Sequence, residues 1–125
     1  MTLLALACFK QPEIQVSSDA ASLASNVPVP PDWTEVRWAG RPLGSVGLGP
    51  TDTVLVAIFP GADTSALSRL GDRDVLVDPV LAGKLGLPET LSGERFEPEV
   101  LDAAHWDTNF IIEGDYGVVV TWYSR

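Results

Sequence analysis

The run Thr53-Val-Leu-Val-Ala-Ile-Phe59 constrains the architecture more than any other segment of this chain. It is continuously apolar and rich in β-branched residues, and Pro60-Gly61 ends it. A strand with one solvent-exposed face alternates apolar and polar residues, whereas an unbroken apolar run is typical of a strand that is buried on both faces. We therefore expect residues 53–59 to be a central strand.

Further strands are expected on both sides of this run. The upstream candidates are Thr2–Phe9 and Trp33–Trp38, and a short one follows at Asp74–Val77. Near the C-terminus, Asn109–Glu113 and Gly117–Tyr123 flank Gly114-Asp115-Tyr116, which fits a tight hairpin loop with glycine supplying a positive φ. Positions 118, 120 and 122 are all apolar, so their face of the last strand should be the core face.

Short helices are expected where a capping residue or proline precedes a helix-compatible segment. Four segments qualify: Ser17-Ser18-Asp19 capping through about Ser25, Ser65–Leu70 closed by Gly71, Val80–Leu85 opened by Asp78-Pro79, and Pro98 through about Trp106. Residues 27–32, Val-Pro-Val-Pro-Pro-Asp, must be extended, because each proline fixes its own φ and disfavours helix at the preceding residue.

Together these signals predict an α+β fold in a single globular domain, 1–125. We expect about five or six mainly antiparallel strands, about three or four short helices and a C-terminal β-hairpin. The proline-rich segment 27–32 is interpreted as an extended connection, because neither side of it alone would hold an adequate core.

The N-terminal segment is open to two interpretations. Thr2–Phe9 is apolar, with its only nearby cation, Lys10, after the run, which favours a buried first strand in a cytoplasmic protein. Alternatively, Leu4–Cys8 resembles the end of a lipoprotein signal, which would make the chain a periplasmic lipoprotein anchored through Cys8 if the true start lies upstream. A single cysteine cannot form an internal disulfide, and no apolar run is long enough to span a bilayer.

The sequence predicts no metal and no cofactor. One histidine and one cysteine exclude the usual zinc sites. The acids near 72–78 are separated by apolar residues, which does not fit a calcium loop. The glycine-rich segment 44–49 leads into a proline and a strand instead of the helix that a phosphate-binding loop requires.

An enzyme is the alternative hypothesis, because a small hydrolase could use His105 with a nearby carboxylate. Asp107 lies two residues from His105, and Glu113 and Asp115 form a second possible acid–base pair. No Gly-x-Ser-x-Gly motif is present to hold a nucleophile.

Charge is the strongest functional signal. The chain carries 17 acidic and 8 basic residues, for a formal net charge of -9, which argues against direct nucleic-acid binding. Residues 89–125 hold eight acids and two bases, so they contribute -6 of that total. Acids interspersed with aromatic residues suit an interface with a basic protein. The predicted partner-binding residues are Glu97, Glu99, Asp102, Trp106, Asp107, Glu113, Asp115 and Tyr116.

These observations lead us to expect a soluble, non-enzymatic acidic protein that neutralises a basic protein partner, such as a toxin or a nucleic-acid-binding enzyme. It would occlude the partner's active or nucleic-acid-binding site, as an immunity protein, antitoxin or inhibitor does. A homodimer through a strand edge is also possible, with Gly117–Tyr123 as the candidate edge.

Overall fold

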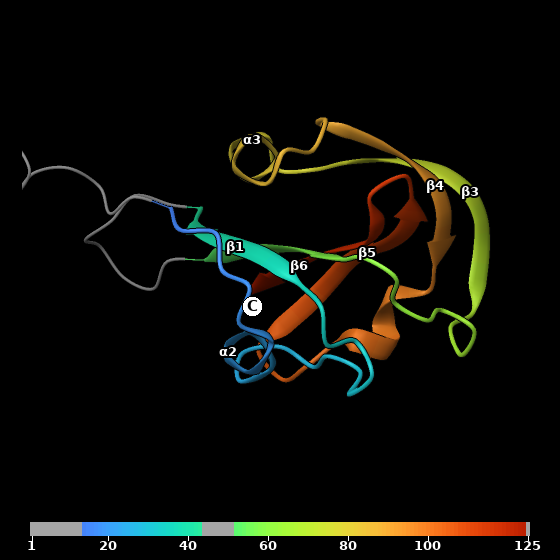
Figure 1. Cartoon of the computed structure of the whole chain (residues 1–125), viewed down its shortest axis with the longest axis horizontal. Coiled ribbons are helices and arrows are strands. Elements are labelled where there is room, and N and C mark those ends of the chain that lie inside the picture. The colour runs from blue at the N-terminus through green and yellow to red at the C-terminus, as the bar shows by residue number, and fades with distance from the viewer. Residues whose placement is uncertain (1–13, 44–51, 125) are drawn as a thin grey trace, which may run out of the picture.

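The computed structural model describes residues 14–43 and 52–124. In those ranges the chain forms a six-stranded antiparallel sheet with the order β1-β2-β6-β5-β4-β3 (Figure 1). The strands are β1 (Arg37–Pro42), β2 (Thr53–Phe59), β3 (Arg69–Leu76), β4 (Thr90–Phe96), β5 (Trp106–Gly114) and β6 (Gly117–Ser124). Two α-helices, α2 (Ala20–Ala24) and α3 (Pro79–Leu85), and one 3-10 turn, η1 (Pro98–Leu101), complete the elements. The α+β prediction holds in this coarse form, with fewer helices than expected.

The central strand is confirmed. β2 lies between β1 and β6, and its residues are buried from Val54 onward. Its alternate side chains enter two cores: Val54, Val56 and Ile58 pack under α3, and Leu55, Ala57 and Phe59 pack under α2 and η1. Figure 1 shows these helical elements on opposite sides of the sheet. We call the two clusters the α3 core and the α2 core.

The N-terminal connection seals the α2 core. Residues 28–30 belong to no helix or strand, in line with the extended connection expected for 27–32, but Val27 lies in a bend and residues 31 and 32 form a turn that the N–H of Trp33 closes on the carbonyl of Pro30 at 3.0 Å. Val27, Trp33 and Val36 are buried there. The strand expected at Trp33–Trp38 begins only at Arg37. Trp33 is held by tertiary contacts instead, because its ring lies 5.0 Å from that of Phe59 and its indole N–H donates to the carbonyl of Asp63 at 3.0 Å.

The C-terminal hairpin is confirmed, with two corrections. Its turn consists of residues 115 and 116, and the positive φ of 93° belongs to Gly117 instead of Gly114. β6 is buried on both faces, because Val119 enters the α3 core while Val118 enters the α2 core. The expected edge position of Gly117–Tyr123 is wrong, since β6 lies between β2 and β5.

Two helix predictions are wrong. At Ser65–Leu70 the chain makes turns and then enters β3, where Gly71 (φ 92°) lies at a register shift instead of capping a helix. After Pro98 the helix is limited to η1, because the backbones of Ala103 and Trp106 exchange hydrogen bonds of 3.0 and 3.3 Å that turn the chain into β5. The strand expected at 74–77 is the end of the longer β3, and β4 was not anticipated.

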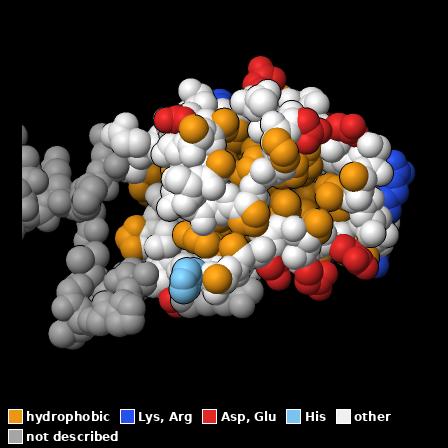
Figure 2. Space-filling view, turned by 90° about the horizontal axis from the view of Figure 1, so that it is seen from below, with side chains coloured by type: hydrophobic (Ala, Val, Ile, Leu, Met, Phe, Trp, Pro, Cys, Tyr) orange, Lys and Arg blue, Asp and Glu red, His pale blue; other side chains and the backbone are white. Residues whose placement is uncertain are grey.

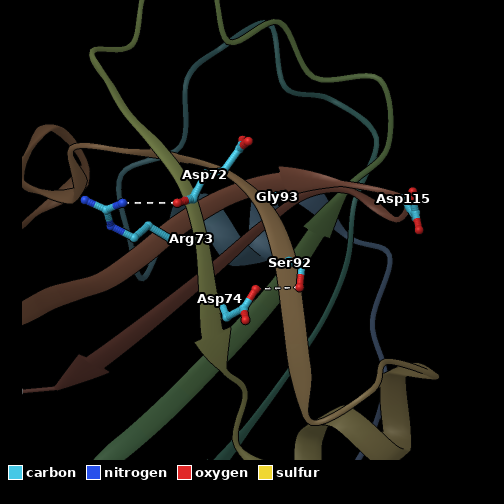
Figure 3. Close-up of a pocket in the computed structure, with 6 residues that line it drawn as sticks. All are labelled: Asp72, Arg73, Asp74, Ser92, Gly93 and Asp115. Atoms are coloured by element: carbon cyan, nitrogen blue, oxygen red, sulfur yellow. Dashed lines mark hydrogen bonds between the residues drawn. The ribbon is translucent and has the colours of Figure 1, made fainter.

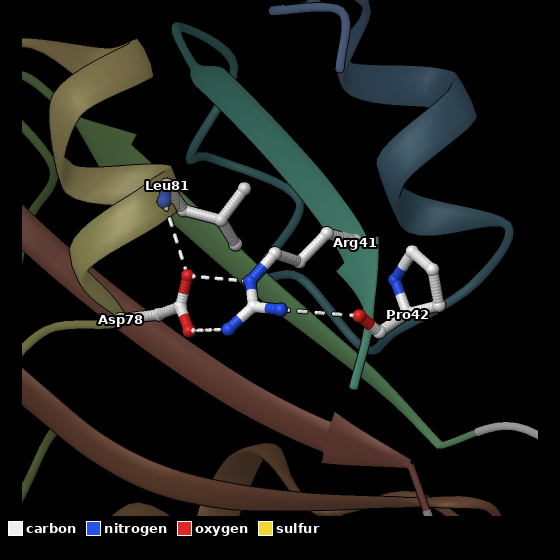
Figure 4. Close-up of polar contacts among 4 residues, drawn as sticks. All are labelled: Arg41, Pro42, Asp78 and Leu81. Atoms are coloured by element: carbon white, nitrogen blue, oxygen red, sulfur yellow. Dashed lines mark hydrogen bonds and ion pairs between the residues drawn. The ribbon is translucent and has the colours of Figure 1, made fainter. Parts of the chain in front are cut away.

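The two remaining helix signals are confirmed. Asp19 caps α2 and Asp78 caps α3, and Gly86 ends α3 with a φ of 74°. Asp78 also binds Arg41 of β1, which joins α3 to that edge of the sheet (Figure 4). α3 connects β3 to β4 and therefore lies between that end of the two strands and β1. The sheet curves around α3 (Figure 1).

The predictions for residues 1–13 and 44–51 lie outside the described residues. They include the strand at 2–9, the lipid-anchor alternative at Cys8 and the glycine-rich loop at 44–49. Among the helices that the structure does describe, none is long and apolar enough to cross a membrane.

Thr121 offers a test of the packing. It is fully buried on the α3 side of β6, and its hydroxyl has no hydrogen-bond partner in the described part of the chain. Replacing Thr121 by valine removes this unsatisfied group at nearly constant volume, so the free energy of unfolding should rise by about 1 kcal/mol. Urea denaturation measures the change, with the exposed Thr34→Val as the matched control. A loss of stability in Thr121→Val would contradict the burial of an unpaired hydroxyl.

Candidate functional site

A row of three carboxylates crosses β3, β4 and β5. The register places Asp72 opposite Glu94 and Glu94 opposite Glu113. Directly opposite residues of antiparallel strands point to the same face, with Cβ atoms about 5 Å apart. Three acidic side chains from distant parts of the sequence therefore stand side by side on the face that carries the α2 core. We call Asp72, Glu94 and Glu113 the carboxylate row.

A second set of polar residues lies beside this row. Asp74 is opposite Ser92, whose hydroxyl donates to Asp74 Oδ1 at 2.6 Å. Figure 3 shows these two side chains facing each other, with Asp115 on the neighbouring hairpin tip. An open hollow of about 660 Å³ lies here, lined by Asp72, Arg73, Asp74, Ser92, Gly93 and Asp115. The carboxylate row together with Asp74 and Asp115 is called the tip surface below.

Two glycines allow β4 and β5 to approach closely at this point. A Cβ on Gly93 would lie 2.2 Å from the carbonyl oxygen of Glu113, and one on Gly114 would lie 2.7 Å from that of Ser92. β4 pairs with β5 only over Glu94–Phe96, and its residues Thr90–Gly93 pair with β3 alone, so β4 diverges from β5 at this crossing. Both glycines are therefore needed for the close approach of β4 and β5 beside the tip surface.

The carboxylate row is only partly neutralised. Arg69 Nη1 lies 2.9 Å from Glu94 Oε1, and the hydroxyl of Thr64 donates to Glu113 Oε1 at 3.1 Å. The Arg69 side chain is 72% exposed, and an ion pair this exposed contributes at most about 1 kcal/mol. Like charges directly opposite each other on adjacent strands are destabilising. The like-charge pairing within the row therefore opposes folding, and the contacts of Arg69 and Thr64 act against it.

The partner-binding residues predicted from the sequence fall into two groups. Glu113, Asp115 and Tyr116 lie at the hairpin tip, and Glu113 and Asp115 belong to the tip surface. The other five, called the η1 group, lie just before η1, within it, in the turn after it or at the start of β5: Glu97, Glu99, Asp102, Trp106 and Asp107.

Trp106 and Asp107 of the η1 group lie far from the hairpin tip, whereas Glu97 follows Glu94 by three residues. The ends of β5, Trp106 and Gly114, are about 25 Å apart at about 3.3 Å per residue. Asp107 pairs with Tyr123 and Glu113 with Val118, which places the two acids on opposite faces of the sheet. Figure 2, which shows the face with α2 and η1, has acidic side chains around its margins and hydrophobic ones between them.

The aromatic residues of the C-terminal third serve mainly the core. Phe96 and Phe110 are buried, Trp106 is half-buried against the α2 core, and Tyr116 is 43% exposed. Asp102 also has a structural contact, since its carboxylate accepts the N–H of Thr108 at 2.8 Å. Tyr116 is thus the aromatic side chain of this segment that is best placed to contact a partner.

Sequence reasoning did not assign Asp72, Asp74 and Glu94 to the site. A usable signal existed in Asp72-x-Asp74, because acids two apart in a strand share a face. It could not be interpreted without β4, which connects β3 to β5 and was not predicted.

His105 lies exposed in the turn between η1 and β5. Three surface hollows of the structure, at the tip surface, beside Pro60 and beside α2, do not include it in their walls. Within residues 14–43 and 52–124, no group of three or more histidine, cysteine or acidic residues is arranged to hold a metal ion. The use of His105 in a hydrolase stays an untested hypothesis.

Comparison with known proteins gives no relative from which a function could be transferred. The chain matches no protein-family model, and no significant similarity links it to a curated protein or to a solved structure.

Proposed function

We propose that this chain is a non-enzymatic acidic binding protein that neutralises a basic protein partner. It would do so by occluding the partner's active site or nucleic-acid-binding site, in the manner of an immunity protein or inhibitor. The observation that carries the proposal is the carboxylate row, in which three like charges are held on adjacent strands although this arrangement disfavours folding.

The tip surface has the properties that such docking requires. Five carboxylates, at 72, 74, 94, 113 and 115, are contributed by three strands and a hairpin turn, against three cations on β3 and β4, Arg69, Arg73 and Arg95. Concentrated negative potential accelerates encounter with a basic cleft and disfavours acidic partners. The exposed ring of Tyr116, next to Asp115, adds contact area at low conformational-entropy cost. The shallow hollow suits a protruding basic segment better than a small molecule.

Charge reversal at the tip surface tests the proposal. Asp72→Lys/Asp115→Lys changes two exposed acids of the tip surface, and Glu97→Lys/Glu99→Lys changes two exposed acids of the η1 group. Each substitution of an acid by lysine raises the net charge by two, so both variants change the formal net charge from -9 to -5. The two variants differ in where on the surface the charge is changed. Affinity capture from the native host, with quantitative mass spectrometry, compares both variants with the original chain.

We expect the original chain and the Glu97/Glu99 variant to recover the same strongly basic protein. The Asp72/Asp115 variant should recover at least about tenfold less of it, because close opposite charges at an interface couple strongly. Equal recovery by all three proteins would remove the tip surface from the interface. Recovery lost only in the Glu97/Glu99 variant would transfer the interface to the η1 group.

A further inference from the structure

β3 is an outer strand of the sheet and has no further strand beside it within residues 14–43 and 52–124. This strand pairs with β4 only, so one row of its backbone N–H and C=O groups has no strand beside it among the described residues. At the opposite edge, Trp38 of β1 exchanges two backbone hydrogen bonds of 2.8 Å with Ser17, and Arg37 and Arg41 contact α3 and its cap. An open edge is a template on which an extended segment of another chain can add a strand.

The side chains along β3 define what such a segment would meet. Asp72, Asp74 and Leu76 alternate along the strand and share the face of the carboxylate row. Leu76 is 74% exposed, which is unusual for a leucine in a strand and leaves apolar surface beside the two acids. An added strand would therefore have an acid, an acid and a leucine as its successive cross-strand neighbours on this face.

A second copy of β3 fits this edge poorly. Two identical antiparallel strands related by a two-fold axis must pair residues that point to the same face. Centring the axis on Asp72 or Asp74 places that acid opposite itself, and centring it on Arg73 places Asp72 opposite Asp74. Each of these registers sets like charges directly against each other, which is destabilising. Centring the axis on Val75 instead places Asp74 opposite Leu76, so this register provides no cation opposite either acid. The chemistry of the edge thus favours a different chain with cationic side chains.

We propose that β3 binds an extended segment of the basic partner as a seventh strand, with lysine or arginine opposite Asp72 and Asp74 and an apolar residue opposite Leu76. This inference rests on the proposed function and specifies how the partner is held. Backbone pairing supplies the affinity, and the alternation of basic side chains along the segment supplies the specificity. The carboxylate row behind β3 extends the negative potential over the same face.

Two synthetic peptides of identical composition test the strand pairing. Both are capped and rich in threonine. In one, two lysines and a leucine occupy alternate positions, and in its isomer the two lysines are adjacent. We expect the alternating peptide to bind at least about tenfold more tightly than the isomer, because only there do both lysines face the acids. Hydrogen exchange should show protection of β3 amides when it binds.

Two double variants localise the contact. Asp72→Asn/Asp74→Asn should weaken binding of the alternating peptide about tenfold, whereas Glu97→Gln/Glu99→Gln, with the same charge change, should leave it unchanged. Equal binding of the two peptides would overturn the inference. Protection confined to residues 114–117 would also overturn it, and would leave docking on the tip surface standing. If the charge substitutions on the tip surface change neither the binding of the peptides nor the recovery of the captured basic protein, the proposed function fails as well.

Discussion

Replacing Gly93 by alanine should destabilise the protein by about 3 kcal/mol or more. The new Cβ would lie 2.2 Å from the carbonyl oxygen of Glu113, 2.9 Å from its carbonyl carbon and 3.3 Å from the Cα of Gly114. All three are backbone atoms of β5, so no side chain can rotate to relieve the contact. β4 would have to move away from β5, which would also separate Glu94 from Glu113.

Gly83→Ala is the matched control. Gly83 lies inside α3 and is exposed, and a Cβ added there would have no neighbouring atom within 4 Å. Alanine at this position should stabilise the helix by about 0.5–1 kcal/mol, because glycine loses more conformational entropy on folding. Urea denaturation of both variants gives the comparison. An unchanged midpoint for Gly93→Ala would show that β4 and β5 are not as close as the structure places them.

Replacing Asp78 by alanine should cost about 3 kcal/mol, the second large effect. One carboxylate oxygen accepts both the Nε–H of Arg41 at 2.8 Å and the N–H of Leu81 at 3.1 Å, and the other accepts from Arg41 Nη2 (Figure 4). The Asp78 side chain is only 7% exposed. Its removal would uncap α3 and deprive the Arg41 guanidinium of its carboxylate partner, leaving its hydrogen bond of 3.2 Å to the Pro42 carbonyl.

Asp78→Asn separates the two contributions, because asparagine also caps helices well but carries no charge. Asp78→Asn should lose less stability than Asp78→Ala. The stability that Asp78→Asn does lose measures the contribution of the ion pair with Arg41. Thermal unfolding at neutral pH measures both variants. Equal losses in the two would mean that the cap contributes little and the ion pair accounts for the effect.

The same residue predicts a pH dependence. The hydrogen bond from Arg41 holds the pKa of the Asp78 carboxyl below its ordinary value, although burial opposes this shift. A carboxyl with a lowered folded-state pKa stabilises the fold above its unfolded-state pKa of about 4, and the contribution disappears as pH falls through the folded-state value. Stability of the original chain should therefore decline below about pH 4 more steeply than that of Asp78→Asn. Parallel acid profiles would contradict this linkage.

The elements that could be predicted from the sequence are those that a short stretch of neighbouring residues is enough to specify. β2 follows from its unbroken apolar run, and α3 follows from Asp78-Pro79 at its start and Gly86 at its end. Capping residues such as Asp63 also occur at the start of turns, and there they led to a wrong prediction of a helix. Asp63 accepts the N–H of Ser65 at 2.9 Å, which lowers the pKa of its carboxyl, yet this cap begins a turn and no helix.

The parts that could not be predicted depend on contacts between distant segments. β4 has only Leu91 and Phe96 as buried residues, so its pattern does not predict a strand; its pairing with β3 and β5 completes it. The same pairing creates the carboxylate row. Glu113 and Asp115 were therefore found as a local concentration of charge, whereas Asp72 depends on a register that the sequence alone does not specify.

The association rate constant with the captured basic partner, measured against ionic strength, tests the docking role of the tip surface most directly. At low ionic strength, Asp72→Lys/Asp115→Lys should associate at least about tenfold more slowly than the original chain, with a flatter salt dependence. Glu97→Lys/Glu99→Lys, with the same net charge, should remain close to the original. If both variants slow association equally, the effect is one of net charge, and the tip surface has no docking role.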